Sequence, residues 1–447
     1  MGSEMCIRDR NNNTDKPAIG IEMFNMAKDL FPFCRSITGD GVRKTLQYIN
    51  DQIPQLSIHS IQSGAKVFDW EVPEEWTIRD AYIADSSGKR IIDFKKNNLH
   101  VVGYSMPIDE WMSLESLNNF LYSLPDQPSA IPYITSYYEK RWGFCLTHNQ
   151  RLELKNEDYH VVIDSEIKPG VLNYADIVLP GKSKKEVLLS TYICHPSMAN
   201  NELSGPVVAI ALINWLKNLN NRLYTYRIIF IPETIGSIVY LSKHLEHLKE
   251  NVIAGYVLTC VGDDRCYSYL PSRKGNTLSD RAAIHVLKHI DPHYKSYTWL
   301  DRGSDERQLC SPGVDLPIAT IMRSKYFEYP EYHTSLDDLT LVTPSGLEGA
   351  FNALKYAIQI IENNHCYKTM MNCEPQLGKR GLYPTLSTKE SGAEVEAIMN
   401  LISYCDGSKD LLEISEIIGE KFETLLPIVE ILLNNSIIQN LQNIQND

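Results

Sequence analysis

The segment EVLLSTYICHPSMANNELSGPVVAIALINWLKNL, residues 186–219, gives the clearest indication of how this chain folds. Its first eight residues are mostly apolar or β-branched and predict a buried strand, whereas residues 205–219 form an apolar helical run. The polar residues between them would lie at the carboxyl end of the strand, just before the helix begins. A strand that leads through a polar turn into a helix is the repeating unit of α/β proteins.

The same unit recurs along the chain between residues 177 and 364. Apolar strands alternating with amphipathic helices predict an α/β fold with a mixed, mostly parallel sheet covered by helices on both faces. The later strands are expected at 226–233, 254–261 and 316–322, and the later helices at 236–250, 278–290 and 345–361.

Composition changes along the chain predict further domains. Residues 67–171 hold short aromatic and β-branched segments between turn residues, typical of an inserted β-rich domain. Residues 380–447 have a helical apolar period and predict a C-terminal winged-helix-like unit. The main α/β domain would then comprise residues 17–66 and 172–372, after a disordered extension or tag at residues 1–16.

Charge and hydropathy argue against several classes of partner. The formal net charge is −13 and no dense Lys/Arg stretch occurs, so neither nucleic acid nor an anionic membrane is expected as a partner. Residues 391–447 hold ten acidic and two basic residues, so we favour protein contact or packing over DNA binding for the C-terminal unit. The longest apolar run, residues 207–216, is well short of the roughly 20 residues that span a bilayer.

The expected location is the cytoplasm. The N-terminus lacks the apolar core of a signal peptide. Ten cysteines are scattered without CxxC spacing, which is typical of buried thiols in a reducing compartment.

Polar residues that could carry chemistry follow three of the predicted strands. His195 follows the first strand, Glu233 ends the next, and His333 lies in the loop after the last. Ligands of α/β proteins bind at the carboxyl edge of the sheet, so these side chains are expected to converge there. Two histidines and a carboxylate form a donor set that suits a metal ion.

Three segments, CHPSMANNELSG, PETIGS and EYHTSLDDL, resemble the signature segments of the zinc aminopeptidase and carboxypeptidase superfamily. The chain is more narrowly similar to bacterial aminopeptidase-like proteins of unassigned substrate, associated with polysaccharide biosynthesis, that carry an inserted β-rich domain and a C-terminal winged helix. This resemblance covers residues 17–440 and is strengthened by RSITGDG, SYYEKRWGFC and RGSDERQLCSPGVDLP.

The resemblance implies an aminopeptidase-like catalytic domain in which His195 and His333 bind zinc and Glu233 is the general base. Asn201, Thr234 and Thr259 stand where the superfamily has carboxylates, so one zinc ion is expected rather than two. The predicted metal site is His195, His333 and Asn201, and the sequence leaves open whether a carboxylate completes it. The candidate carboxylates are Asp263, Asp264 and Asp305.

The predicted function is a zinc-dependent amide hydrolase of aminopeptidase type, acting on a small peptide or amide. Arg35, Asp305 and Arg307 are the expected substrate-binding residues, since guanidinium groups bind carboxylates or phosphates in bidentate fashion. Two alternatives stay open: a hydrolase of a sugar amide in polysaccharide biosynthesis, and a non-catalytic binding protein on a degenerate exopeptidase fold. A homo-oligomer is also left open.

Several of these residues have simpler interpretations. Glu233 could cap the following helix, Asn201 and Glu202 could cap the helix at 205–219, and Cys194 is expected to be a small buried residue. Asp337 is expected to cap or to be solvated, with orientation of the His333 ring as its functional alternative.

Overall fold

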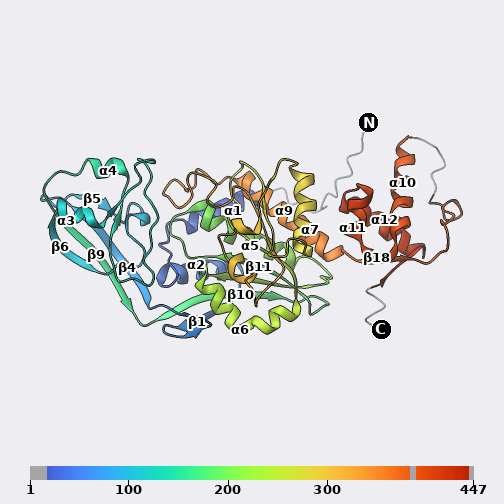
Figure 1. The fold of residues 1–447 in the computed structure, drawn as a ribbon, viewed down its shortest axis with the longest axis horizontal. Coiled ribbons are helices and arrows are strands. Elements are labelled where there is room, and N and C mark those ends of the chain that lie inside the picture. Colours follow the sequence, from blue (N-terminus) through green and yellow to red (C-terminus); the bar gives the residue numbers. More distant parts are fainter. Residues whose placement is uncertain (1–17, 383–388, 442–447) are drawn as a thin grey trace.

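A computed structural model of the protein describes residues 18–382 and 389–441. The inserted domain lies at one end of the long axis, the main sheet in the middle and the C-terminal helices at the other end (Figure 1). The extension predicted at residues 1–16 lies outside the described residues. Within the described part of the chain, no helix is long and apolar enough to cross a membrane.

An eight-stranded mixed sheet forms the centre of the main domain. Its central strands β12, β11, β13 and β16 run parallel to one another, and antiparallel strands adjoin them on both sides. This arrangement confirms the α/β class and the mixed, mostly parallel sheet. In spatial order the strands are β1 (Ser57–Gln62), β10 (Val171–Leu179), β12 (Thr225–Ile231), β11 (Glu186–Tyr192), β13 (Val252–Val257), β16 (Ile318–Met322), β14 (Ser268–Leu270) and β15 (Lys295–Ser296).

Helices cover both faces of this sheet, as predicted. Alternate residues of β11 point to opposite faces: Val187 and Leu189 pack in one apolar cluster with α1, α5, α7 and α9, and Leu188 packs in another with α6. Strands buried on both faces are continuously apolar, which is why the sequence indicates them so plainly. The helices are α1 (Ile19–Leu30), α2 (Asp40–Gln52), α5 (Ser204–Lys217), α6 (Ile235–Asn251), α7 (Leu278–Ile290), α8 (Glu306–Leu309) and α9 (Pro344–Asn363).

The inserted domain is built on a four-stranded antiparallel sheet with its own apolar core, which includes Phe144 and Tyr159. Its strands, in spatial order, are β5 (Arg90–Asp93), β4 (Glu75–Ala84), β9 (Asp158–Lys168) and β6 (Ile108–Ser113). Smaller elements complete it: β2 (Lys66–Val67), β3 (Trp70–Glu71), α3 (Leu114–Leu117), β7 (Leu121–Tyr122), β8 (Phe144–Cys145) and α4 (His148–Leu152).

The C-terminal unit combines three helices with a three-stranded sheet, the composition of a winged helix. Because strand β17 belongs to that sheet, the unit begins near residue 365, earlier than the expected residue 380. Arg281 of α7 pairs with Asp410 at 2.7 Å and ties this unit to the main domain. Its elements are β17 (Cys366–Thr369), α10 (Lys389–Tyr404), β18 (Asp406–Asp410), α11 (Leu411–Ile418), α12 (Phe422–Asn434) and β19 (Ile438–Asn440).

Candidate active site

Four loops meet at the carboxyl edge of the sheet, because they follow the adjacent parallel strands β12, β11, β13 and β16. Each loop contains a residue other than glycine with a positive φ angle, a conformation that costs backbone energy and is concentrated at functional sites. These residues are Ser197 (42°), Thr234 (64°), Cys260 (52°) and His333 (56°).

The structure brings His195, Glu233 and His333 together. The two imidazole rings lie 5.4 Å apart between centroids, and Glu233 Oε2 lies 3.7 Å from His195 Nε2. Burial lowers the pKa of each histidine to about 3, so both rings are neutral near pH 7 and can offer a lone pair. Two neutral imidazole rings and the Glu233 carboxyl group therefore lie next to one another.

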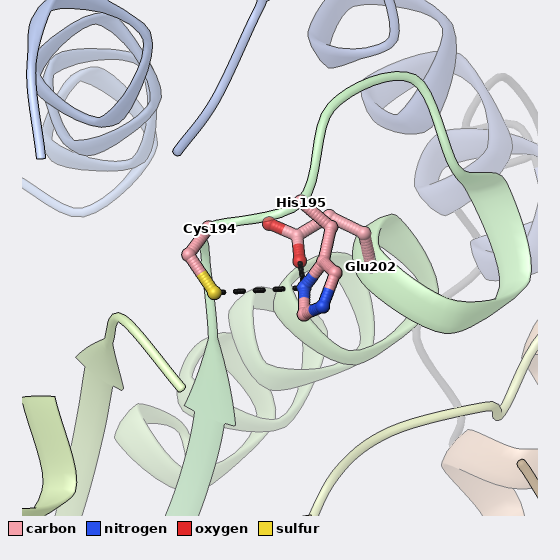
Figure 2. Close-up of side chains that lie close together, drawn as sticks. All are labelled: Cys194, His195 and Glu202. Atoms are coloured by element: carbon pink, nitrogen blue, oxygen red, sulfur yellow. Dashed lines mark hydrogen bonds and ion pairs between the residues drawn. The ribbon is translucent and has the colours of Figure 1, made fainter. Parts of the chain in front are cut away.

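The other ring nitrogen of His195 faces a different set of side chains. In Figure 2 the sulfur of Cys194 and the carboxylate of Glu202 both point at Nδ1, at 3.5 and 3.1 Å. Arg35 Nε lies 3.3 Å from Glu202 Oε1, and both side chains are fully buried. Burial raises the pKa of Glu202 to about 8, while the adjacent charge of Arg35 acts in the opposite direction and favours the charged carboxylate. When Glu202 is charged, Nδ1 of His195 donates the shared proton and the Nε2 lone pair is left free.

Cys194, His195 and Glu202 lie close enough to hold a metal ion, with their ligand atoms within 4.8 Å of one another. Two observations oppose that interpretation. The charge of Arg35 already balances the Glu202 carboxylate and would repel a cation. Cys194 has the buried character predicted for it, and burial raises its thiol pKa well above the usual value. We therefore interpret these residues as the support that orients His195.

Of the three predicted substrate-binding residues, only Arg307 has an exposed side chain. Arg35 is fully buried and donates to the carbonyl oxygens of Leu30 and His195, so the prediction that it clamps a substrate is wrong. Asp305 is also buried, and its Oδ1 accepts from Thr234 N at 2.8 Å, beside Glu233. Arg307 is exposed, and its guanidinium donates to Thr234 Oγ1 at 3.0 Å.

Asn201, the third predicted metal ligand, lies in a single π-helical turn, Ala199–Leu203, and takes part in a different network. Its Oδ1 accepts a short hydrogen bond from the Tyr192 hydroxyl, which also lies 2.6 Å from Thr259 Oγ1. All three residues are buried, and none carries a charge. The amide oxygen that was expected to bind metal is therefore already engaged.

Two of the three alternative carboxylates are engaged in hydrogen bonds elsewhere, whereas Asp305 lies beside Glu233 and its buried Oδ2 has no hydrogen-bond partner among the described residues. Asp263 accepts from Ser324 N and Arg265 N, and Asp264 accepts from Thr343 and Ser345. With Asn201, Thr234 and Thr259 uncharged, the site does not fit two divalent cations, whose charges need carboxylate ligands. His195, His333 and Glu233 are the residue types of an established zinc donor set, so their chemistry suits one ion. Their ligand atoms are less tightly gathered than those of Cys194, His195 and Glu202, the one group among the described residues whose ligand atoms all lie within 4.8 Å of one another.

Glu233 is also suited to proton transfer. Its side chain keeps 20 % of its surface exposed. Burial, reinforced by the negative charge of Asp305, raises its pKa to about 8. A carboxyl group with a pKa near the working pH can both accept and release a proton.

Asp337 does not orient the His333 ring. Its carboxylate oxygens accept from the backbone N–H groups of Asn200 and Asn201 and from the Tyr329 hydroxyl. Asp337 therefore caps the turn that carries Asn201, which agrees with the simpler interpretation of this residue.

Sequence reasoning missed Tyr133, through which the inserted domain contacts this site. Tyr133 lies 5.2 Å from the His195 ring and 5.1 Å from the His333 ring, and its N–H donates to the His333 carbonyl at 2.9 Å. Asn98 Nδ2 donates to Ser197 Oγ at 2.7 Å, next to the His195 loop. The neighbouring Tyr137, which belongs to the segment SYYEKRWGFC of the family resemblance, has its hydroxyl 2.9 Å from that of Tyr133.

Comparisons with known proteins agree with this architecture. Residues 24–364 match the model of the Domain of unknown function (DUF4910), and residues 365–440 match a winged helix-turn-helix model. A relative from Clostridium acetobutylicum is 43% identical over 408 residues, which cover 91% of this chain and 93% of that protein. Its name refers to polysaccharide biosynthesis and to an aminopeptidase-like domain.

Solved structures show the same fold at lower sequence identity. A crystal structure from Clostridium acetobutylicum, whose name refers to a peptidase, has a TM-score of 0.89 and 41% identity, and it covers 94% of this chain and 96% of that one. The zinc aminopeptidase BSAP from Bacillus subtilis has a TM-score of 0.57 at 12% identity, over 77% of this chain and 95% of that one. A Peptidase M28 precursor from Shewanella amazonensis has a TM-score of 0.56 at 12% identity, over 80% and 95%. The chain thus belongs to the DUF4910 family, with an aminopeptidase-like fold followed by a winged helix-turn-helix domain.

Proposed function

We propose that this protein is an amide hydrolase of aminopeptidase type that binds one zinc ion. The observation that carries the proposal is the convergence of His195 Nε2, His333 and Glu233 at the carboxyl edge of the sheet. The fold shared with zinc aminopeptidases supports the class of reaction, although at 12% identity it shows the fold alone.

The mechanism assigns a task to each nearby group. A bound zinc ion would make water more acidic and polarise the carbonyl group of an amide. Glu233 accepts a proton from the attacking water and returns it to the leaving nitrogen as the carbon–nitrogen bond breaks. Glu202 and Arg35 fix the His195 ring from behind. Arg307, exposed beside Thr234, binds a negatively charged group of the substrate.

Glu233 could instead be a metal ligand, because a carboxylate oxygen 3.7 Å from Nε2 is near enough for either role. Glu233→Gln separates the two. If Glu233 is the base, the Glu233→Gln variant should still bind one zinc ion per chain, while its kcat falls by about 10²–10⁴-fold. Loss of zinc from the variant would show that Glu233 is a metal ligand. Full amide-hydrolase activity in the zinc-bound variant would overturn the role of Glu233 as base.

Two other functions each have an observation in their favour. The name of the C. acetobutylicum relative favours a hydrolase of a sugar amide in polysaccharide biosynthesis. The uncharged network of Tyr192, Asn201 and Thr259 favours a binding protein that has lost catalysis. A panel of aminoacyl anilides and N-acyl amino sugars distinguishes the two hydrolases, and absence of zinc after metal supplementation would favour the binding protein.

We also propose that the protein acts in the cytoplasm on a small peptide or amide. All nine cysteines in the described part of the chain are unpaired, which supports a reducing compartment.

A further inference from the structure

The two histidines of the proposed zinc site lie on separate loops, and the inserted domain contacts both loops. His195 lies on the loop after β11, and His333 lies on the loop after β16. Asn98 Nδ2 donates to Ser197 Oγ at 2.7 Å, two residues from His195. Residues 131–133, which we call the pairing segment, lie alongside the loop of His333.

The pairing segment meets the His333 loop as a neighbouring antiparallel strand would. Pro132 and Thr334 form an antiparallel bridge. Next to that bridge, the Tyr133 N–H donates to the His333 carbonyl at 2.9 Å. The inserted domain therefore holds the main chain of the histidine itself, in addition to packing the Tyr133 ring against the imidazole.

The pairing continues at Ser335, on the other side of the bridge. Its N–H donates to the Ile131 carbonyl at 2.9 Å, and its Oγ accepts from the Ile131 N–H at 2.9 Å. His333, between these bonds and the turn before it, has a φ of 56°. A residue other than glycine keeps such a conformation only where its surroundings hold it, so the pairing segment stabilises the backbone that aims this ring.

The parts of the inserted domain that contact the two loops are joined to each other. The Gly103 N–H donates to the Ile134 carbonyl at 2.8 Å. Leu99 and Ile131 lie in the same buried apolar cluster. Asn98, at one loop, and the pairing segment, at the other, therefore belong to one packed unit.

We infer that the inserted domain is a positioning element of the zinc site, which sets the separation of the His195 and His333 rings by holding their two loops; this inference rests on the proposed function. The ring centroids lie 5.4 Å apart. Metal affinity depends on ligands that are held in place by the groups behind them. Loosening either contact should therefore weaken zinc binding, although neither contact touches the ion.

Zinc affinity of the full chain, measured by competition with a chromophoric chelator, tests this inference. Ser335→Ala removes the acceptor of the Ile131 N–H, and Asn98→Ala removes the donor to Ser197. Each variant should bind zinc about 2- to 10-fold more weakly, as expected for the loss of one hydrogen bond. Ser335→Thr keeps a hydroxyl acceptor and should restore most of the affinity. With cobalt(II) in place of zinc, the visible absorption spectrum of both alanine variants should shift, because the arrangement of the ligands changes.

Three control variants separate positioning from a general loss of stability. Ser86→Ala and Asn119→Ala remove exposed polar side chains of the inserted domain and should leave zinc affinity unchanged. Val161→Ala opens the apolar core of the four-stranded sheet, a cluster separate from that of Leu99 and Ile131. It should lower the midpoint of thermal unfolding and leave the cobalt spectrum as it is in the wild type. The same unfolding measurement shows whether Ser335→Ala and Asn98→Ala are folded, and either one decides the question.

Unchanged zinc affinity and unchanged cobalt spectra in the alanine variants would overturn the inference and leave the proposed function intact. A spectral shift of equal size in Val161→Ala would overturn it as well. Zinc binding that weakens as expected, in a protein that cleaves no amide, would sink the hydrolase and keep the positioning role. Absence of zinc from the metal-supplemented wild type would contradict both.

Discussion

The two ring nitrogens of His195 face two different environments. On the Nδ1 side, Glu202 and Arg35 are fully buried and their charges balance. On the Nε2 side, Glu233 is partly exposed, and the neutral ring of His333 lies close by. The first side has a buried counter-charge, whereas the second has two neutral rings and a partly exposed carboxyl group near the exposed Arg307. Proximity of ligand atoms alone would point to the Nδ1 side, so charge balance is the better guide to a metal position.

The largest expected effect follows from breaking the ion pair on the Nδ1 side. Arg35→Met leaves the Glu202 carboxylate buried without its counter-charge, so the free energy of unfolding should fall by about 3–5 kcal/mol. Urea denaturation measures this change. The double variant Arg35→Met/Glu202→Gln should recover part of the loss, because it removes both charges. A single-variant loss well below 1 kcal/mol would contradict the charge-balance argument.

The next largest effect is on zinc affinity, because Glu202 on the Nδ1 side orients the His195 ring that binds zinc through Nε2. Glu202→Gln keeps the shape of the side chain but weakens the acceptor that holds the Nδ1 proton, so zinc affinity should fall about 10- to 100-fold. Competition with a chromophoric chelator measures the affinity. Glu246→Gln, an exposed change on α6, is the matched control. Unchanged affinity in Glu202→Gln would mean that this carboxylate does not orient the ligand histidine.

A smaller effect is expected in the uncharged network beside the site. Tyr192→Phe removes the hydroxyl that lies between Asn201 and Thr259, so stability should fall by about 1–2 kcal/mol. Zinc content should stay at one ion per chain, because Tyr192 lies apart from the donor set. Binding of a second zinc ion by the variant would contradict our explanation that the uncharged residues Tyr192, Asn201 and Thr259 limit the site to one ion.

The smallest effect is a pH dependence of the metal-free protein. The pKa of Glu233 is raised to about 8 when folded, so between the unfolded value of 4.5 and pH 8 the folded state binds more protons than the unfolded state. Its contribution to stability therefore falls as pH rises through that window. From pH 6 to 8, chelated wild-type protein should lose stability of the order of 1 kcal/mol more than Glu233→Gln does. If stability changed equally with pH in the two proteins, the pKa of Glu233 would not be raised.

Much of the fold could be predicted because its signals are local. The strands around β11 are buried on both faces and therefore read as apolar runs, and their parallel order brings His195, Glu233 and His333 to one edge. The short strands β14 and β15, the last two at one side of the sheet, carry no such pattern. Strand β17 pairs with β18 and β19, well over thirty residues further along, so nothing near Cys366 marks the start of the C-terminal unit.

The partners of the site residues could not be predicted, because they depend on contacts between distant segments. The segment around Arg35 was recognised in the sequence. The contact of Arg35 with Glu202, however, brings the loop after α1 against the turn before α5, two segments far apart in the sequence. Nothing in the sequence indicates that the Tyr192 hydroxyl donates a hydrogen bond to the Asn201 amide oxygen. Nor does it indicate that Tyr133 of the inserted domain contacts both histidines.

An anomalous difference map at the zinc edge, from crystals grown with zinc, tests the central claim most directly. We expect one peak, bonded to His195 Nε2 and His333 on the side of Glu233. A peak between Cys194 and Glu202 on the Nδ1 side, or two peaks sharing Asn201, would contradict the account.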